Sequence, residues 1–265
     1  MPIYNVYDNI DILNNIIIAE KSGKKAEDII LLETIDSTNN YIKRNFKSLS
    51  YGTVVIAENQ TAGKGRLGRS FLSFNNSGIY MSIYLKALEN SEASLKITAA
   101  AALIVSLAIE KCAKKSPEIK WVNDLLLENR KICGILCEGI VSPESARLEG
   151  IVLGIGINVY KPQNDFAEEI KDIAGHIEDK PCENLRNDII AEILKGLDNL
   201  DLEDGSVLEE YRRRSFVLEK EILVLKNGES KKAKACEIDE NFHLKVLYPN
   251  GTAEALSFGE VSIRI

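Results

Sequence analysis

The residues best suited to chemistry lie in one short stretch, QTAGKGRLGR, from Gln60 to Arg69. Three glycines alternate there with three cations, Lys64, Arg66 and Arg69. Glycines let backbone N–H groups converge on an anion, and the interleaved cations supply the charge that a phosphate or carboxylate demands. The chain carries 40 acidic residues, yet residues 59–88 contain none. The pattern predicts a loop that clamps an anion.

The same loop comes close to three known motifs. GKGRLG matches the dinucleotide-binding pattern G-x-G-x-x-G, but that motif opens a helix directly after a strand. Here residues 70–85 alternate, turn at 75–78 and alternate again, which predicts a β-hairpin. As G-x-x-x-x-G-R-S the loop resembles a P-loop, except that Arg69 stands where lysine is required. A nucleic-acid contact loop or a solvated glycine loop are the remaining interpretations.

Composition limits the classes of protein to consider. The 265 residues are 45% hydrophobic, enough for one large domain and a small one, and the net charge of −7 disfavours general binding to DNA, RNA or anionic membranes. Five cysteines without a C-x-x-C pair, and only two histidines, support neither a disulfide framework nor a zinc site. We expect no signal peptide and no stretch that approaches membrane-spanning length. A cytoplasmic globular enzyme is predicted.

Hydrophobic periodicity predicts the elements that must position the loop. Residues 1–28 supply a short amphipathic helix and a connector. Asp36, Ser37 and Thr38 are expected to cap a helix that runs to about Phe46, with a Ser or Thr hydroxyl accepting from its first free N–H groups. From residue 219 every segment alternates, with turns at 226–230 and 249–251, which indicates a small all-β domain. The other predicted strands are 29–35, 53–58, 118–122, 125–127, 131–140 and 147–157, and the other helices are 91–115, 185–200 and 207–214.

With these elements placed, the chain resembles the catalytic core of biotin protein ligases. The matching segments are STN at 37–39, ENQTAGKGRLGRSFLS at 58–73, KWVNDLLLENRKICGILCE at 120–138, GIGINV at 154–159 and GEVSIRI at the end. The resemblance implies an α+β fold, in which a mixed β-sheet is flanked by helices as in class II aminoacyl-tRNA synthetases. It further implies a catalytic domain at 1–215, with a short extension at 1–28, and an SH3-like β-barrel at 216–265.

The resemblance also implies a reaction in two steps. Biotin's carboxylate attacks the α-phosphate of ATP to give biotinyl-AMP and pyrophosphate, and a lysine of a biotin carboxyl carrier protein domain then attacks the anhydride. Because two anions must meet, catalysis depends mainly on positioning and on neutralisation by arginine, lysine and Mg²⁺. Lys64, Arg66 and Arg69 are suited to that task.

Roles transfer to matching positions only as what the resemblance implies. Lys131, Arg66 and Asp124 would be catalytic, with Asp124 either binding Mg²⁺ or orienting the acceptor lysine. In the sequence, Lys131 has no acidic neighbour nearer than Glu128. Biotin would contact Ser37, Thr38, Asn39, Gln60, Lys64, Gly65, Arg66 and Lys131. ATP or the adenylate would contact Arg66, Arg69, Phe71, Asn123, Asp124, Gly154, Gly156 and Asn158.

Three positions depart from the commoner family pattern. Lys64 replaces arginine, which keeps the charge but gives up bidentate contact. Phe71 replaces tryptophan, so adenine stacking continues on a smaller ring. Val122 replaces proline, which loosens the backbone without removing a functional group. No charge that the chemistry needs is lost.

Partners and alternatives complete the expectations. Only 36 residues precede Ser37, too few for the DNA-binding domain of bifunctional relatives, so we expect a monofunctional ligase that binds no DNA. A homodimer is compatible with the sequence. A lipoate or octanoate protein ligase of the same architecture is the nearest alternative, and a non-catalytic nucleic-acid or phosphate-binding protein is the second.

Overall fold

The computed structural model describes residues 11–87, 91–142, 147–226, 228–257 and 260–262. Their largest feature is a seven-stranded sheet with the order β1-β2-β3-β7-β6-β5-β4. β1 and β2 run parallel, and every other neighbouring pair is antiparallel, so the sheet is mixed as predicted. The strands are β1 Ile29–Ile35, β2 Val54–Gln60, β3 Gly78–Lys86, β4 Glu118–Lys120, β5 Asp124–Leu127, β6 Arg130–Val141 and β7 Leu148–Asn158.

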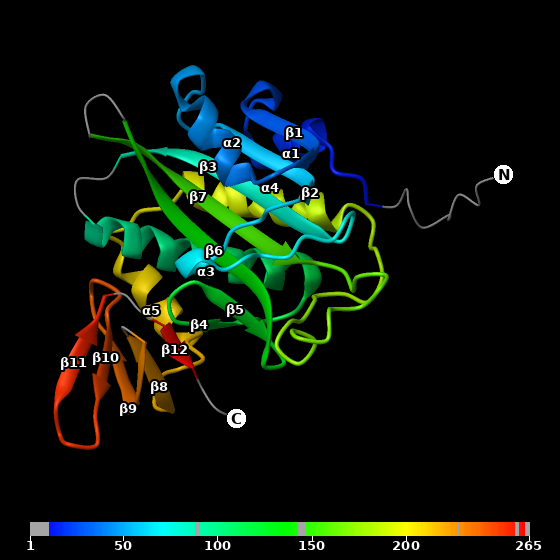
Figure 1. Cartoon of the computed structure of the whole chain (residues 1–265). Helices are drawn as coiled ribbons and strands as arrows, with labels where there is room; N and C mark the ends of the chain where they lie inside the picture. Colours follow the sequence, from blue (N-terminus) through cyan, green and yellow to red (C-terminus); the bar gives the residue numbers. More distant parts are fainter. Residues whose placement is uncertain (1–10, 88–90, 143–146, 227, 258–259, 263–265) are drawn as a thin grey trace.

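Helices cover both faces of this sheet (Figure 1). On one face lies α2, Thr38–Asn45, where Ile42 packs with Val55, Tyr84 and Val152. The other face carries the main core beneath α3, Ser91–Ala113, and α4, Leu185–Asp198, with α1, Asn15–Ser22, packed against α4. Since strand side chains alternate between faces, β3, β6 and β7 each present a second row of residues on the α2 side. That second row forms the floor of the site described below.

Helix α3 is the central helix of the main core. Its residues Ala99–Ala102 are all fully buried, and α5, Gly205–Arg213, packs beside it. By length and composition alone α3 could cross a membrane, so the expectation that no stretch reaches membrane-spanning length is wrong. However, 61% of its most apolar window is buried inside the protein, as in the core helix of a globular fold.

A second, antiparallel sheet follows, with the order β11-β10-β9-β8-β12. It touches the large sheet through Trp121, whose indole N–H donates to the carbonyl of Phe242 at 2.8 Å. The amide N–H of Phe216 also donates to the carbonyl of Ile119 at 2.8 Å. All five strands of this sheet lie after residue 219, so the predicted small all-β unit is confirmed. Its strands are β8 Glu221–Lys226, β9 Glu229–Ile238, β10 Leu244–Leu247, β11 Ala253–Leu256 and β12 Glu260–Ser262.

Two local predictions are wrong. Ser37 occupies the N-cap position of α2, but its hydroxyl makes no capping bond; the first amide N–H of the helix, that of Thr38, donates to the side-chain oxygen of Gln60 at 2.8 Å. The hairpin at 70–85 is also absent: residues 71–74 form no strand. Both edges of β3 are already paired, with β2 and β7, so the segment before it pairs instead with the start of the loop.

Candidate active site

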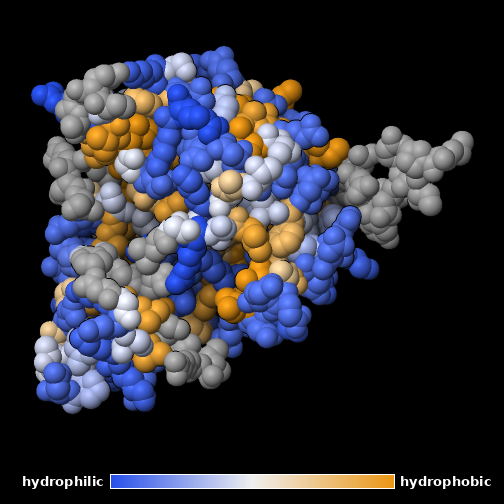
Figure 2. All heavy atoms as spheres, viewed as in Figure 1, coloured by the Kyte–Doolittle hydropathy of each residue, from blue (hydrophilic) through white to orange (hydrophobic). Residues whose placement is uncertain are grey.

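Two adjoining cavities open on the α2 face of the sheet, with volumes of about 270 and 30 Å³. They share Lys64, Phe71, Gly134 and Leu136 in their walls. Figure 2 shows polar side chains running down the centre of this face, with apolar patches on either side. Among the predicted site residues, the larger cavity is also lined by Gly65, Arg66, Arg69, Asn123, Asp124 and Lys131, and the smaller by Ser37, Thr38, Asn39, Gln60, Gly154 and Gly156.

The glycine-rich loop covers the larger cavity and folds back on itself. The amide N–H of Gly65 donates to the carbonyl of Arg69 at 2.7 Å, and the amide N–H of Arg69 donates to the carbonyl of Arg66 at 3.2 Å. Gly68 has a φ of +73°, a left-handed conformation that favours glycine. At Gly63 a Cβ atom would lie 2.4 Å from the carbonyl oxygen of Phe71. Two of the three loop glycines are thus required by the backbone itself.

A chain of polar contacts links the loop to the strands beneath it. Arg66 donates to Oδ1 of Asn123 at 2.8 Å, and the Asn123 amide donates to Asp124 and to the carbonyl of Ile135, both at 3.0 Å. The ammonium of Lys131 lies 2.7 Å from Oδ1 of Asp124. The acid nearest to Lys131 is therefore Asp124, not Glu128 as the sequence suggested. A guanidinium and an ammonium converge here with a single carboxylate.

The smaller cavity combines polar and apolar walls. The Oε1 atom of Gln60 accepts from the amide N–H of Thr38 and lies 3.1 Å from its hydroxyl, which turns the Gln60 NH₂ group away from Thr38. Met81, Leu136 and Ile155 provide apolar surface. Such a lining suits a compact ligand with an apolar body and a group that both donates and accepts hydrogen bonds.

Phe71 separates the two cavities. Its ring lies on β6 and β7, where a Cβ atom added to Gly156 would be 2.7 Å from the ring and one added to Gly134 would be 3.4 Å away. In the cross-strand pairing Gly134 stands opposite Gly156, so the two glycines form one flat patch. Only a strand without side chains at these positions lets an aromatic ring lie directly on the sheet.

Asn158 is the one predicted site residue that lines neither cavity. Its side-chain amide donates to the carbonyl of Gly175 at 3.0 Å, and the amide N–H of Gly175 donates to the carbonyl of Lys131 at 2.8 Å. Asn158 thus holds a loop that in turn holds the backbone of Lys131. The family resemblance also implied biotin contacts for Gly65, Arg66 and Lys131, and all three line the larger cavity and not the smaller one.

The described residues do not form a metal site. They contain no cluster of three or more His, Cys, Asp or Glu side chains, and the one carboxylate at the site, Asp124, already pairs with Lys131. Mg²⁺ commonly binds one or two carboxylates together with substrate phosphates. The ion therefore fits this site only as part of an Mg–ATP substrate, and we assign no step to a resident metal.

Several wall residues were missed by sequence reasoning. Trp121 lies in a quoted motif, but its role as a wall was not foreseen. Leu225 and Val261 enter the larger cavity from the small sheet. A signal for Leu225 exists in EILVLK, where apolar residues occupy both faces of the strand, indicating that the second face is also covered. Ser82 and Glu138, which bond to the residues of the smaller cavity, gave no such signal.

Comparison with known proteins places this geometry in context. Residues 31–158 match the sequence profile of the Biotin/lipoate A/B protein ligase family. The Bifunctional ligase/repressor BirA of Bacillus subtilis is 38% identical over 144 residues, which are 54% of this chain and 44% of that protein. The chain thus spans less than half the length of that relative. The Biotin--[acetyl-CoA-carboxylase] ligase of Mycobacterium tuberculosis is 28% identical over 79% of this chain and 78% of its own.

Solved structures agree with the fold. The biotin protein ligase from Aquifex aeolicus, in complex with biotin and ATP, superimposes with a TM-score of 0.74 at 29% identity. The match covers 89% of this chain and 98% of the other. The large mixed sheet and the small antiparallel sheet are therefore those of an established ligase fold.

Proposed function

We propose that this chain is a biotin protein ligase, because residues 31–158 match the sequence profile of the Biotin/lipoate A/B protein ligase family. It would activate biotin with ATP to biotinyl-5′-AMP and transfer the biotin to a lysine of a biotin carboxyl carrier protein domain. The observation that carries the proposal is the pair of adjoining cavities on either side of Phe71, one compact with mostly neutral walls, the other lined by five cations.

In this proposal the smaller cavity binds the ring system of biotin. Thr38, Asn39 and Gln60 offer hydroxyl and amide groups, which match a ureido group that both donates and accepts. The carboxylate tail would then pass Phe71 into the larger cavity. With the ring system held in the smaller cavity, the carboxylate would be positioned for reaction in the larger one.

Activation would take place in the larger cavity. A carboxylate oxygen attacks the α-phosphorus, and the bond from that phosphorus to the pyrophosphate oxygen breaks. Lys131 and Arg66 would neutralise the two anions as they approach. Asp124 and Asn123 hold those cations in place through the 2.7 and 2.8 Å contacts. Phe71 would pack against the adenine, and Arg69 would contact the adenylate.

Transfer would follow when the carrier lysine reaches the anhydride. Its amine attacks the carbonyl carbon, and AMP leaves. The loop residues Lys64 and Arg69 are exposed and line the larger cavity, so the carrier lysine would pass close to them. All five cysteines are free, which is compatible with action in a reducing cytoplasm.

Exchange of labelled pyrophosphate into ATP tests the proposal. We expect exchange to depend on biotin and not on lipoate or octanoate. Exchange with lipoate alone would identify a lipoate protein ligase, and its absence with every acid would favour a non-catalytic phosphate-binding protein. A purified carrier domain should then take up biotin at one lysine, detected by mass.

A further inference from the structure

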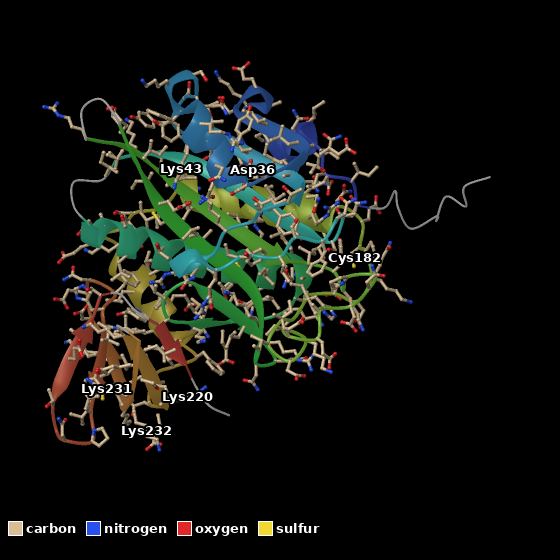
Figure 3. The ribbon with its side chains drawn as sticks, viewed as in Figure 1. Asp36, Lys43, Cys182, Lys220, Lys231 and Lys232 are labelled. Carbon is tan, nitrogen blue, oxygen red and sulfur yellow. The ribbon has the colours of Figure 1, made fainter. Side chains whose placement is uncertain are left out.

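A carboxylate with no part in the chemistry above lies beside the smaller cavity. Glu138 on β6 faces α2, where its Oε2 accepts from the Asn39 amide at 2.8 Å and its Oε1 accepts from the Lys43 ammonium at 2.7 Å. Lys43 points from α2 toward the sheet (Figure 3). Burial opposes ionisation of Glu138, but the bonds from Asn39 and Lys43, and the charges of Lys43 and Lys64, prevail and lower its pKa. At neutral pH Glu138 is therefore an acceptor only.

An acceptor-only group dictates how the neighbouring amide is turned. Asn39 must direct its NH₂ toward Glu138, which leaves Oδ1 toward the hydroxyl of Ser82, 2.5 Å away. Gly154 lies directly beneath, because a Cβ atom there would be 2.2 Å from that Oδ1. The Asn39 amide is thus held from three sides.

The orientation of Asn39 in turn fixes the next hydroxyl. The Ser82 oxygen lies between Asn39 Oδ1 and the Thr38 hydroxyl, at 2.5 and 2.7 Å, and it has one proton to give. Asn39 Oδ1 has none, so the Ser82 proton goes there. Thr38 receives no proton from Ser82, and it donates its own to Ser82 or to Gln60. The lone pairs of Thr38 therefore remain available to a ligand in the smaller cavity.

We propose that Glu138, supported by Lys43, is a positioning residue that makes Thr38 a hydrogen-bond acceptor for an N–H group of the ligand. The effect passes through Asn39 and Ser82, and Glu138 itself does not touch the ligand. The inference rests on the proposed function, since the ureido ring of biotin supplies N–H groups of this kind.

Glu138→Gln is the direct test because it replaces one carboxylate oxygen by NH₂. If that NH₂ faced Lys43, two donors would oppose each other, so the amide must turn its oxygen to Lys43 and its NH₂ to Asn39. Asn39 then flips, Ser82 donates to Thr38, and Thr38 loses an acceptor position. We expect the Kd for biotin, measured by calorimetry on the full chain, to rise about 10-fold, with the Kd for ATP unchanged.

Adding Lys43→Met to that variant should restore binding. Without the ammonium, the introduced amide can keep its oxygen toward Asn39, so the wild-type orientation returns. We expect the double variant to bind biotin at least threefold more tightly than Glu138→Gln alone. A purely structural role for Glu138 predicts the opposite order, because the double variant has lost more contacts. If Glu138→Gln does not fold, Glu138→Asp, which remains acceptor-only, should stay within about threefold of wild type, and a 10-fold loss there would overturn the inference.

Asp36→Asn is the matched control. Asp36 accepts from the Asn40 amide at 2.8 Å and from Arg44 at 2.7 Å, as Glu138 does from Asn39 and Lys43, but it lines neither cavity (Figure 3). Its substitution should leave the Kd for biotin unchanged. Equal affinity of wild type and Glu138→Gln, or no recovery in the double variant, overturns the inference alone. Failure of the wild type to bind biotin overturns the proposed function as well.

Discussion

Gly154→Ala is expected to disturb the smaller cavity by displacing Asn39. The new Cβ would lie 2.2 Å from Oδ1 and 2.9 Å from Cγ of Asn39, closer than real Cβ contacts allow. The backbone φ of Gly154 is not left-handed, so alanine brings no conformational strain of its own. Asn39 must therefore move by roughly 1 Å to reach ordinary van der Waals distance.

The cost follows from the bonds that such a movement breaks. Asn39 would lose a charge-assisted bond to Glu138 and a neutral one with Ser82, together about 2–4 kcal/mol. Replacing glycine restricts the unfolded chain and offsets about 0.4–1 kcal/mol of this loss. We expect the free energy of unfolding to fall by about 1–3 kcal/mol, and the Kd for biotin to rise at least 10-fold.

Urea unfolding measures the first quantity, because the single tryptophan, Trp121, is buried beside the larger cavity and its fluorescence reports unfolding. Gly139→Ala is the control, since its Cβ would meet only the flexible end of Leu148 at 2.8 Å. Calorimetry with biotin measures the second quantity. Equal stability and equal affinity in the two variants would refute the argument that Gly154 exists to admit Asn39.

Three further predictions concern the charged groups. Lys131→Ala should abolish pyrophosphate exchange and slightly lower the melting temperature, because Asp124 loses its partner; near-normal exchange would show that Lys131 is not catalytic. Arg66→Gly should still form biotinyl-AMP but release it about 10- to 100-fold faster, seen as labelling of an unrelated lysine-rich protein, and labelling at the wild-type level would assign that task elsewhere. Glu210 has a pKa lowered to about 2 by hydrogen bonds from two arginines, so the stability it provides is present above the unfolded pKa near 4.5 and is lost as pH falls toward 2. The difference in urea midpoint between wild type and Glu210→Gln should shrink over that range, and a constant difference would contradict the assignment.

Regular elements followed from local pattern, and the physical reason is visible in particular strands. The strand Ile29–Ile35 has the predicted bounds, although only Ile29 is buried and Glu33 and Thr34 are exposed, because its β-branched residues favour extended backbone. Lys64 and Arg66 could be named as candidate anion contacts because glycines alternate with cations in the loop, whereas Gln60 was named from the family resemblance. Such features depend on residues adjacent in the chain.

Features that depend on register could not be predicted in this way. Lys131 meets Asp124 across a hairpin whose pairing shifts between Leu125 and Leu126, and no pattern of residue types reveals such a shift. The start of α2 differs for a similar reason: the amide N–H of Thr38 donates to the side chain of Gln60, which lies 22 residues later in the chain. Glu138 stood in a quoted motif without a role, because its effect passes through two other side chains.

The wall formed by Leu225 and Val261 has a consequence for biosynthesis. The seven strands of the large sheet are complete once Asn158 has left the ribosome, but the larger cavity lacks that wall until residue 261 has been made. At ordinary translation rates the interval lasts roughly 5–20 s. A nascent chain in that interval has the strands and the cations of the larger cavity but lacks the wall formed by Leu225 and Val261. An anhydride formed there would meet water on that side, so the order of synthesis postpones the completed wall until residue 261 has emerged.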